Sequence, residues 1–70
     1  MDVMERSILS PREVQCLSGV AEGRKNEEIA KSLKISGPTV ALHLQNAKRK
    51  LGAITREHAV ALALRKGLLG

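Results

Sequence analysis

The sequence predicts an all-α fold, a four-helix bundle that contains a helix-turn-helix, with helices at about residues 11–22, 27–33, 37–51 and 56–66. Each segment carries apolar residues at helical spacing and opens at a Ser, Thr or Asn that can cap a helix. The second and third segments are about three residues apart, a connection typical of a helix-turn-helix. Residues 1–8 are expected to form a flexible lead and residues 9–70 one domain.

The first helix is predicted from a capping box, Ser10-Pro11-Arg12-Glu13. The Ser10 hydroxyl can accept a hydrogen bond from the backbone N–H of Glu13, and the Glu13 carboxylate can accept one from the N–H of Ser10. Pro11 then occupies the first helical position, where no backbone donor is needed. Gly23 supplies a residue that tolerates the left-handed backbone at the end of the helix.

The second and third helices follow from two further caps. Asn26 is expected to cap the second helix, whose first turn places Glu27 and Glu28 at the positive end of the helix dipole. Ser36 is expected to cap the third helix, which begins at Gly37-Pro38. This pair of helices is the predicted helix-turn-helix.

The third helix is predicted to have one apolar face and one polar face. The apolar residues recur at i, i+4, i+7 and i+11, which places them on one inward stripe: Val40, Leu44, Ala47 and Leu51. The opposite, outward face is mostly polar or basic and carries Leu42, Gln45, Asn46 and Arg49.

The fourth helix is expected to begin at its cap, Thr55, and to end in a Schellman motif at Gly67-Leu68. Its inward stripe consists of Ala59, Leu62 and Ala63. A second set of apolar residues lies on other faces: Val60, Ala61 and Leu64. A surplus apolar face on so small a bundle predicts a partner helix.

Charge is divided unevenly along the chain. Residues 1–28 hold four basic and six acidic side chains, whereas residues 29–70 hold eight basic and one acidic side chain, which gives the total of +5. A positive field on the C-terminal half suits a polyanionic partner. No apolar run approaches the roughly 20 residues that span a bilayer. The single Cys16 cannot form an internal disulfide, so we expect a cytoplasmic protein.

The outward face of the third helix has the chemistry of a recognition helix in the DNA major groove. Gln45 and Asn46 carry amides that can pair with adenine, and Ala41 and Leu42 can contact a thymine methyl. Five further side chains are expected to contact phosphates: Ser36, Thr39, His43, Lys48 and Lys50. Arg49 is a candidate for either role.

The chain resembles the LuxR-type helix-turn-helix domain, the DNA-binding effector of quorum-sensing regulators and of FixJ/NarL-type response regulators. The resemblance extends from about Leu9 to Leu69 and rests on an ordered set of segments: Leu9-Ser10-Pro11-Arg12-Glu13, Ala21-Glu22-Gly23, Asn26-Glu27-Glu28-Ile29-Ala30, Leu33, Ile35-Ser36, Thr39-Val40, His43-Leu44, Lys50-Leu51-Gly52 and Thr55-Arg56-Glu57-His58-Ala59-Val60-Ala61.

The resemblance implies a transcriptional regulator that binds double-stranded operator DNA as a homodimer and contacts RNA polymerase. It places base readers at the positions of Ala41, Leu42 and Gln45 and the dimer contact on the last helix. Val60, Ala61 and Leu64 then become interface residues, and we expect the free domain to be a monomer or weak dimer. Because Ala41 offers no hydrogen bond where relatives often carry a cation, base reading is expected to depend on Gln45, Asn46 or Arg49.

Other functions are less well supported by the residues. His43, His58 and Cys16 lack metal-ligand spacing, and the chain has neither a glycine-rich phosphate loop nor a nucleophile paired with a base, so we expect no cofactor, no small-molecule ligand and no enzymatic activity. The sensor domain that most LuxR-type regulators carry is not in this sequence. Two alternatives to the regulator remain: a sigma-factor region-four-like promoter-binding module, and a basic helical module that binds protein but not DNA.

Overall fold

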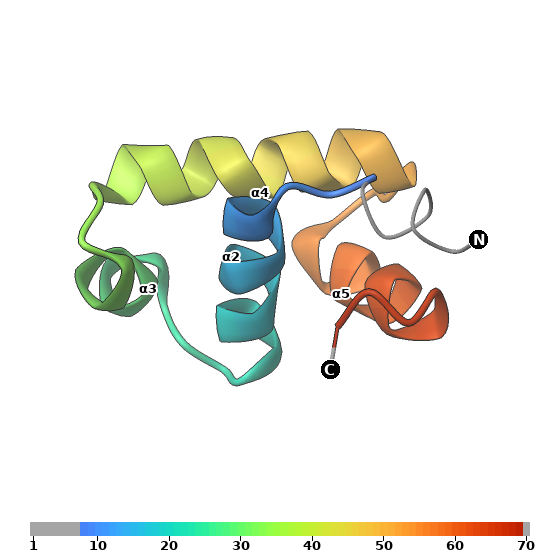
Figure 1. Cartoon of the computed structure of the whole chain (residues 1–70), viewed down its shortest axis with the longest axis horizontal. Helices are drawn as coiled ribbons and strands as arrows, with labels where there is room; N and C mark the ends of the chain where they lie inside the picture. The colour runs from blue at the N-terminus through green and yellow to red at the C-terminus, as the bar shows by residue number, and fades with distance from the viewer. Residues whose placement is uncertain (1–7, 70) are drawn as a thin grey trace.

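The computed structural model describes residues 8–69 of the chain. They form four helices, α2 (Pro11–Ala21), α3 (Asn26–Leu33), α4 (Gly37–Leu51) and α5 (Arg56–Arg65). In Figure 1, α4 runs along one side of the molecule, and α2, α3 and α5 all pack against it. The all-α bundle with a helix-turn-helix is therefore confirmed. The predicted lead at residues 1–8 lies outside the described residues, except for Ile8, which packs against the core.

Most of the predicted caps are present. The Ser10 hydroxyl accepts from Glu13 N at 3.2 Å, and the Glu13 carboxylate accepts from Ser10 N at 2.9 Å, which completes the capping box. Ser36 accepts from the backbone N–H of Thr39, and Thr55 from that of His58. At the other end of α5, Gly67 is left-handed and Leu68 N donates to Ala63 O, as in a Schellman motif.

The start of α3 differs from the prediction. The helix begins at Asn26, and the capping residue is Lys25, whose side chain makes no capping hydrogen bond. The Glu28 carboxylate accepts from Lys25 N at 2.8 Å, which is the half of a capping box that needs no capping side chain. The Asn26 side chain is engaged elsewhere, because its Oδ1 accepts from Arg56 Nη1 at 2.7 Å.

Two other predicted ends are one residue too long. Helix α2 ends at Ala21, with Glu22 as the cap and left-handed Gly23 beyond it, and α5 ends at Arg65. In both helices the predicted last residue is the capping residue, a difference smaller than the usual disagreement over helix ends.

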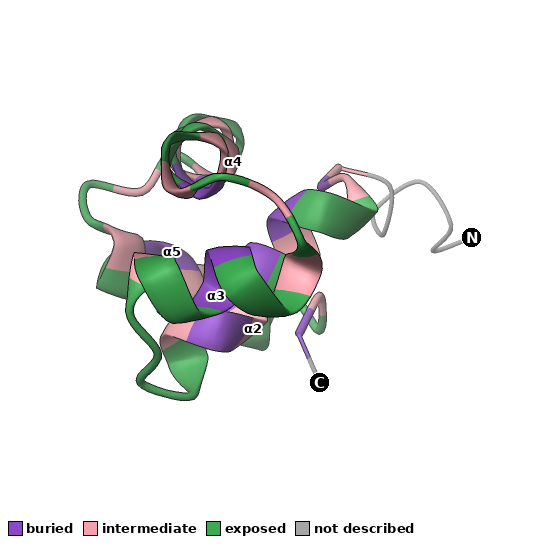
Figure 2. Ribbon diagram, turned by 90° about the vertical axis from the view of Figure 1, so that its left-hand side faces the viewer, coloured by how far each residue is buried: buried purple, intermediate pink, exposed green. Residues whose placement is uncertain are grey.

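The core lies on the side of α4 that faces the other helices. Val40 and Ala47 are fully buried, Leu44 is 4% exposed, and Leu17 of α2 and Ile29 of α3 pack in the same cluster. Figure 2 views α4 along its axis and shows buried residues on the underside of the helix and exposed residues on its outer side. The apolar stripe of α4 thus fixes which face remains outside.

The close approach of α2 and α3 depends on Gly19. A Cβ atom on Gly19 would lie 2.6 Å from Ile29 Cγ1 and 2.8 Å from Ile29 Cδ1. Relieving that overlap costs about 1–3 kcal/mol, which outweighs the gain of about 1 kcal/mol in helix propensity. We expect Gly19→Ala to lower the melting temperature by about 5–10 °C in thermal unfolding followed by circular dichroism.

Gly37→Ala is the matched control for this substitution. A Cβ atom on Gly37 meets no other atom within 4 Å, and its backbone is not left-handed. We expect this variant to melt at or slightly above the wild-type temperature. An equal effect of the two substitutions would show that the Gly19–Ile29 contact does not limit the packing of the two helices.

Candidate nucleic-acid interface

The outer face of α4 is exposed along its length. Ala41, Gln45 and Arg49 are exposed, Leu42 is 57% exposed, and Asn46 is half-buried. Helix α4 has 15 residues and is therefore about 22 Å long, and its outer side protrudes from the body of the domain in Figure 2. A single protruding helix is an element that the major groove admits.

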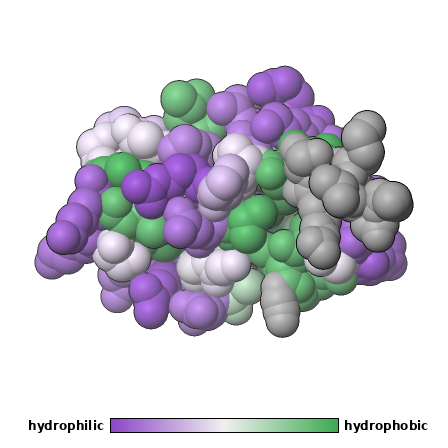
Figure 3. All heavy atoms as spheres, in the orientation of Figure 1, coloured by the Kyte–Doolittle hydropathy of each residue, from purple (hydrophilic) through white to green (hydrophobic). Residues whose placement is uncertain are grey.

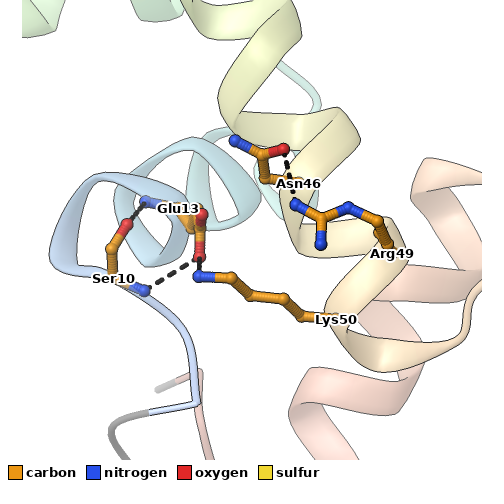
Figure 4. A network of polar contacts seen from close by, with 5 residues as sticks. All are labelled: Ser10, Glu13, Asn46, Arg49 and Lys50. Carbon is orange, nitrogen blue, oxygen red and sulfur yellow. Dashed lines mark hydrogen bonds and ion pairs between the residues drawn. The ribbon is translucent and has the colours of Figure 1, made fainter.

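Two predicted base readers are coupled on this face. Arg49 Nη2 donates to Asn46 Oδ1 at 3.0 Å, which joins residues one turn apart (Figure 4). The bond uses one lone pair of the Asn46 oxygen and one N–H of Arg49, and it leaves the Asn46 amide hydrogens and the other guanidinium N–H groups unused. The free N–H groups of the pair can donate to acceptor atoms on bases and phosphates.

The N-terminal end of α4 brings together two of the predicted phosphate residues. Ser36 Oγ and Thr39 Oγ1 are 2.8 Å apart, and Ser36 Oγ also accepts from Thr39 N at 3.3 Å. The hydroxyls lie at the positive end of the helix dipole, where an anion is stabilised.

Lys50, a third predicted phosphate residue, is held by the domain itself. Its Nζ lies 2.9 Å from Glu13 Oε1, and the side chain of Glu13 is 5% exposed (Figure 4). The ammonium group thus compensates a buried carboxylate that also completes the α2 capping box. The structure gives Lys50 a role within the fold, and of the α4 cations this leaves Lys48 and Arg49 on the outside.

Several groups act on the Glu13 carboxylate. Burial alone would raise the pKa of Glu13. The hydrogen bonds from Ser10 N and Lys50, together with the charges of Lys50 and His43, lower the pKa by more than burial raises it, so it lies below the ordinary value of 4.5. His43 is half-buried and close enough to Glu13 to contribute to this shift. The Glu13 carboxylate is therefore ionised at neutral pH.

A shallow hollow beside α4 brings Asn26 and Arg56, which were not predicted as site residues, next to residues of the predicted interface. Its volume is about 190 Å³, and it is lined by Asn26, Ala41, Leu44, Gln45, Lys48 and Arg56. Arg56 is half-buried, and its hydrogen bond to Asn26 joins the first turns of α5 and α3 at the hollow. Two cations, Lys48 and Arg56, thus flank the predicted base reader Gln45. Only the spatial contact reveals this arrangement, because Asn26 and Arg56 are 30 residues apart.

Comparison with known families agrees with this geometry. Residues 7–63 match the sequence model of the family described as bacterial regulatory proteins, luxR family. The chain belongs to the LuxR family. The predicted resemblance is thereby confirmed, and the helix-turn-helix of α3 and α4 is a LuxR-type DNA-binding motif. The family consists of regulatory proteins and is not a class of enzymes.

Two relatives show the extent of the similarity. The chain is 49% identical over 63 residues to the HTH-type quorum sensing-dependent transcriptional regulator VjbR of Brucella ovis, covering 90% of this chain and 24% of the relative. It is 43% identical over 68 residues to the transcriptional activator protein VanR of Vibrio anguillarum, covering 97% of this chain and 28% of that protein. The chain thus spans about a quarter of the length of these curated relatives.

A solved structure shows the same fold. The structure of the transcription factor GerE superposes with a TM-score of 0.86 at 33% sequence identity, over 90% of this chain and 94% of that chain. The four-helix arrangement described here is therefore the arrangement of a LuxR-family domain.

In this LuxR-type domain, α5 presents a second surface. Ala61 is exposed, Leu64 is 54% exposed, and Val60 is half-buried against the core, whereas Ala59 and Ala63 are fully buried. In Figure 3, hydrophobic atoms gather below the edge formed by α4 in two places, over α3 and where α5 lies. Of the predicted surplus residues, Ala61 and Leu64 are exposed and Val60 instead packs against the core. Leu62, which was predicted to face inward with Ala59 and Ala63, is only half-buried.

His58 and Cys16, the other residues considered as possible site residues, have structural surroundings that explain them. His58 is exposed, and its Nδ1 accepts from the backbone N–H of Ile54 at 3.1 Å. Cys16 is fully buried, and burial raises the pKa of its thiol, which disfavours the reactive thiolate. Among residues 8–69, no helix has the length and apolar character that crossing a membrane requires.

Proposed function

We propose that this LuxR-type domain binds a specific site on double-stranded DNA by placing the outer face of α4 in the major groove. Base reading is assigned to Gln45, Asn46 and Arg49, with Ala41 and Leu42 in apolar contact with thymine methyl groups. Phosphate contacts are assigned to Ser36, Thr39, His43 and Lys48, and to Arg56 at the neighbouring hollow. A DNA phosphate would have to compete with Glu13 for the Lys50 ammonium group, so Lys50 is kept only as a secondary phosphate contact.

One observation carries this proposal: a single helix buries one apolar stripe and leaves the opposite, partly cationic face exposed. Val40 and Ala47 are fully buried, while Gln45 and Arg49 on the other side are exposed. The buried stripe holds the helix rigidly against three others, and the exposed stripe is free to meet base edges.

The dimer forms the second part of the proposal. We propose that two copies bind adjacent half-sites and meet through the α5 surface of Val60, Ala61 and Leu64. Because this apolar surface is small, the free domain is expected to remain monomeric or to dimerise weakly, and DNA supplies the proximity that completes the dimer. In a longer regulator the domain would act in the cytoplasm, where it meets the chromosome and RNA polymerase.

Salt dependence of binding tests the proposal directly. With an operator-sized duplex chosen by selection from a random pool, we expect affinity to fall about tenfold or more between about 50 and 200 mM salt, with a preference for the selected sequence retained. Fluorescence anisotropy measures both. Salt-sensitive binding without any preference would remove the base-reading part of the proposal.

The two alternatives predict different results in the same experiment. A domain that binds protein only would show no salt-sensitive affinity for the duplex. A promoter-binding module of the sigma region-four kind would bind without pairing two half-sites, so a two-fold symmetric site would bind no more cooperatively than a single half-site.

A further inference from the structure

The exposed face of α5 carries a charge pattern as well as apolar residues. At about 100° per residue, Glu57, Ala61 and Leu64 lie on one side of the helix, with Val60 and Arg65 at its edges. Burial agrees with this placement, because Glu57, Ala61, Leu64 and Arg65 are exposed. An acidic residue therefore stands at the beginning of the face and a basic residue at its end.

Glu57 is unusual in its position. It is the only acidic residue among residues 29–70, a stretch that contains eight cations. Its side chain is 76% exposed, and its Oε2 atom lies 3.7 Å from the Nε atom of Arg56, which is a long ion pair. Such an exposed pair contributes little to stability, so Glu57 remains available to a partner.

The spacing of the two charges matches a two-fold axis. Glu57 and Arg65 are each four residues from Ala61, which places them about 6 Å along the helix on either side of it. If a second copy of α5 crosses in antiparallel orientation at Ala61, Glu57 of each copy faces Arg65 of the other, and symmetry forms the pair twice. The small Ala61 side chain lets the helices approach closely at the crossing.

A parallel crossing would have the opposite effect. Glu57 would then face Glu57 and Arg65 would face Arg65, so each contact would be repulsive. The pattern therefore favours the antiparallel crossing over the parallel one.

We propose that α5 recognises a second copy of this chain by crossing it antiparallel at Ala61, with two reciprocal Glu57–Arg65 ion pairs. The inference rests on the proposed dimer and adds its orientation, its register and its basis for self-selection. Val60 and Leu64 supply the apolar contact around the crossing, and the charges select a partner that carries the complementary arrangement.

Charge reversal tests the register. The measurement compares affinity for a two-fold symmetric duplex with affinity for a single half-site, and their ratio gives the cooperativity independently of contacts to DNA. We expect Glu57→Arg and Arg65→Glu each to lower cooperativity about tenfold, since each replaces two attractive pairs with two repulsive ones. The double variant should regain most of the wild-type cooperativity. Lys66→Glu is the matched control, because it makes the same charge change on an adjacent residue that lies off this face.

Mixing the two single variants is the decisive step. A heterodimer of the Glu57→Arg and Arg65→Glu chains restores both attractive pairs, so the mixture should bind the symmetric duplex more cooperatively than either variant alone. Circular dichroism of each variant checks that the fold is retained. Failure of both the double variant and the mixture to recover would overturn the proposed register.

Leu64→Glu separates the register from the dimer itself. If Leu64→Glu abolishes cooperativity while the charge reversals leave it unchanged, α5 is the interface and the register is wrong. If Leu64→Glu also leaves cooperativity unchanged, α5 is not the interface, and the proposed dimer and the register are both contradicted.

Discussion

Glu13→Ala is expected to destabilise the domain by about 3 kcal/mol, because it removes the buried partner of Lys50 and one half of the capping box. A chain of this length is expected to have a total stability of roughly 4–10 kcal/mol, so the loss is a large fraction of it. Urea unfolding at pH 7 followed by circular dichroism measures the change. A loss below about 1 kcal/mol would show that the ion pair is not important to the fold.

The same carboxylate predicts a pH dependence. The pKa of Glu13 is lowered in the folded chain, so its contribution to stability is present above the ordinary value of 4.5 and is lost as pH falls through the lowered value. We expect the wild-type free energy of unfolding to decrease more steeply below about pH 5 than that of Glu13→Gln. The Gln variant controls for the other acidic residues, which titrate equally in both proteins.

A double variant distinguishes the charge from the shape of this pair. Replacing Glu13 by Gln and Lys50 by Met together removes both charges and leaves neither one buried alone. We expect the double variant to be more stable than Glu13→Gln alone. If the stability losses of the Glu13→Gln and Lys50→Met single variants instead add in the double variant, the two residues contribute independently and their contact does not stabilise the fold.

The second large effect concerns DNA. Gln45→Ala is expected to reduce the preference for the selected duplex over a mismatched one by about tenfold or more, because it removes an amide that pairs with a base edge.

Arg49→Ala is expected to weaken binding to all duplexes, because it removes a cation and releases Asn46. The affinity of this variant should also depend less steeply on salt concentration. Anisotropy titrations with matched and mismatched duplexes at two salt concentrations separate the two outcomes.

Arg12→Ala is the matched control for Arg49→Ala. Arg12 is an exposed cation whose Nη1 donates to Gln15 Oε1 at 3.1 Å, the same kind of local bond that Arg49 makes to Asn46. It lies on α2 and has no place in the proposed interface. If the two substitutions weaken binding equally, net charge rather than the α4 face determines the affinity.

The sequence predicts the fold well where local chemistry decides it. Ser10, Ser36 and Thr55 each cap a helix as predicted, since short polar side chains reach the free backbone N–H groups of the next turn. Val40, Leu44 and Ala47 of the predicted stripe are buried, and Leu51 at its end is half-buried against the core, because helical periodicity determines which residues share a face. The exposed face of α4 follows from the same periodicity.

The sequence does not reveal features that depend on distant contacts. The Asn26–Arg56 bond and the Lys50–Glu13 pair join residues 30 and 37 positions apart, and they gave Asn26 and Lys50 roles different from those predicted. The turn between α3 and α4 is a further case: Lys34 has a φ of 59°, a left-handed conformation that normally favours Gly. The bond from Ile35 N to Ala30 O closes this turn despite the unfavourable backbone.

The side-chain amides offer the most direct measurement of where DNA binds. The chain contains two Gln and two Asn residues, so a nitrogen–proton correlation spectrum resolves the amide groups of Gln15, Asn26, Gln45 and Asn46 individually. On titration with the selected duplex, we expect the Gln45 and Asn46 signals to shift strongly while the Gln15 signal on α2 remains in place. Shifts at Gln15 without shifts at Gln45 and Asn46 would contradict the claim that the outer face of α4 enters the major groove.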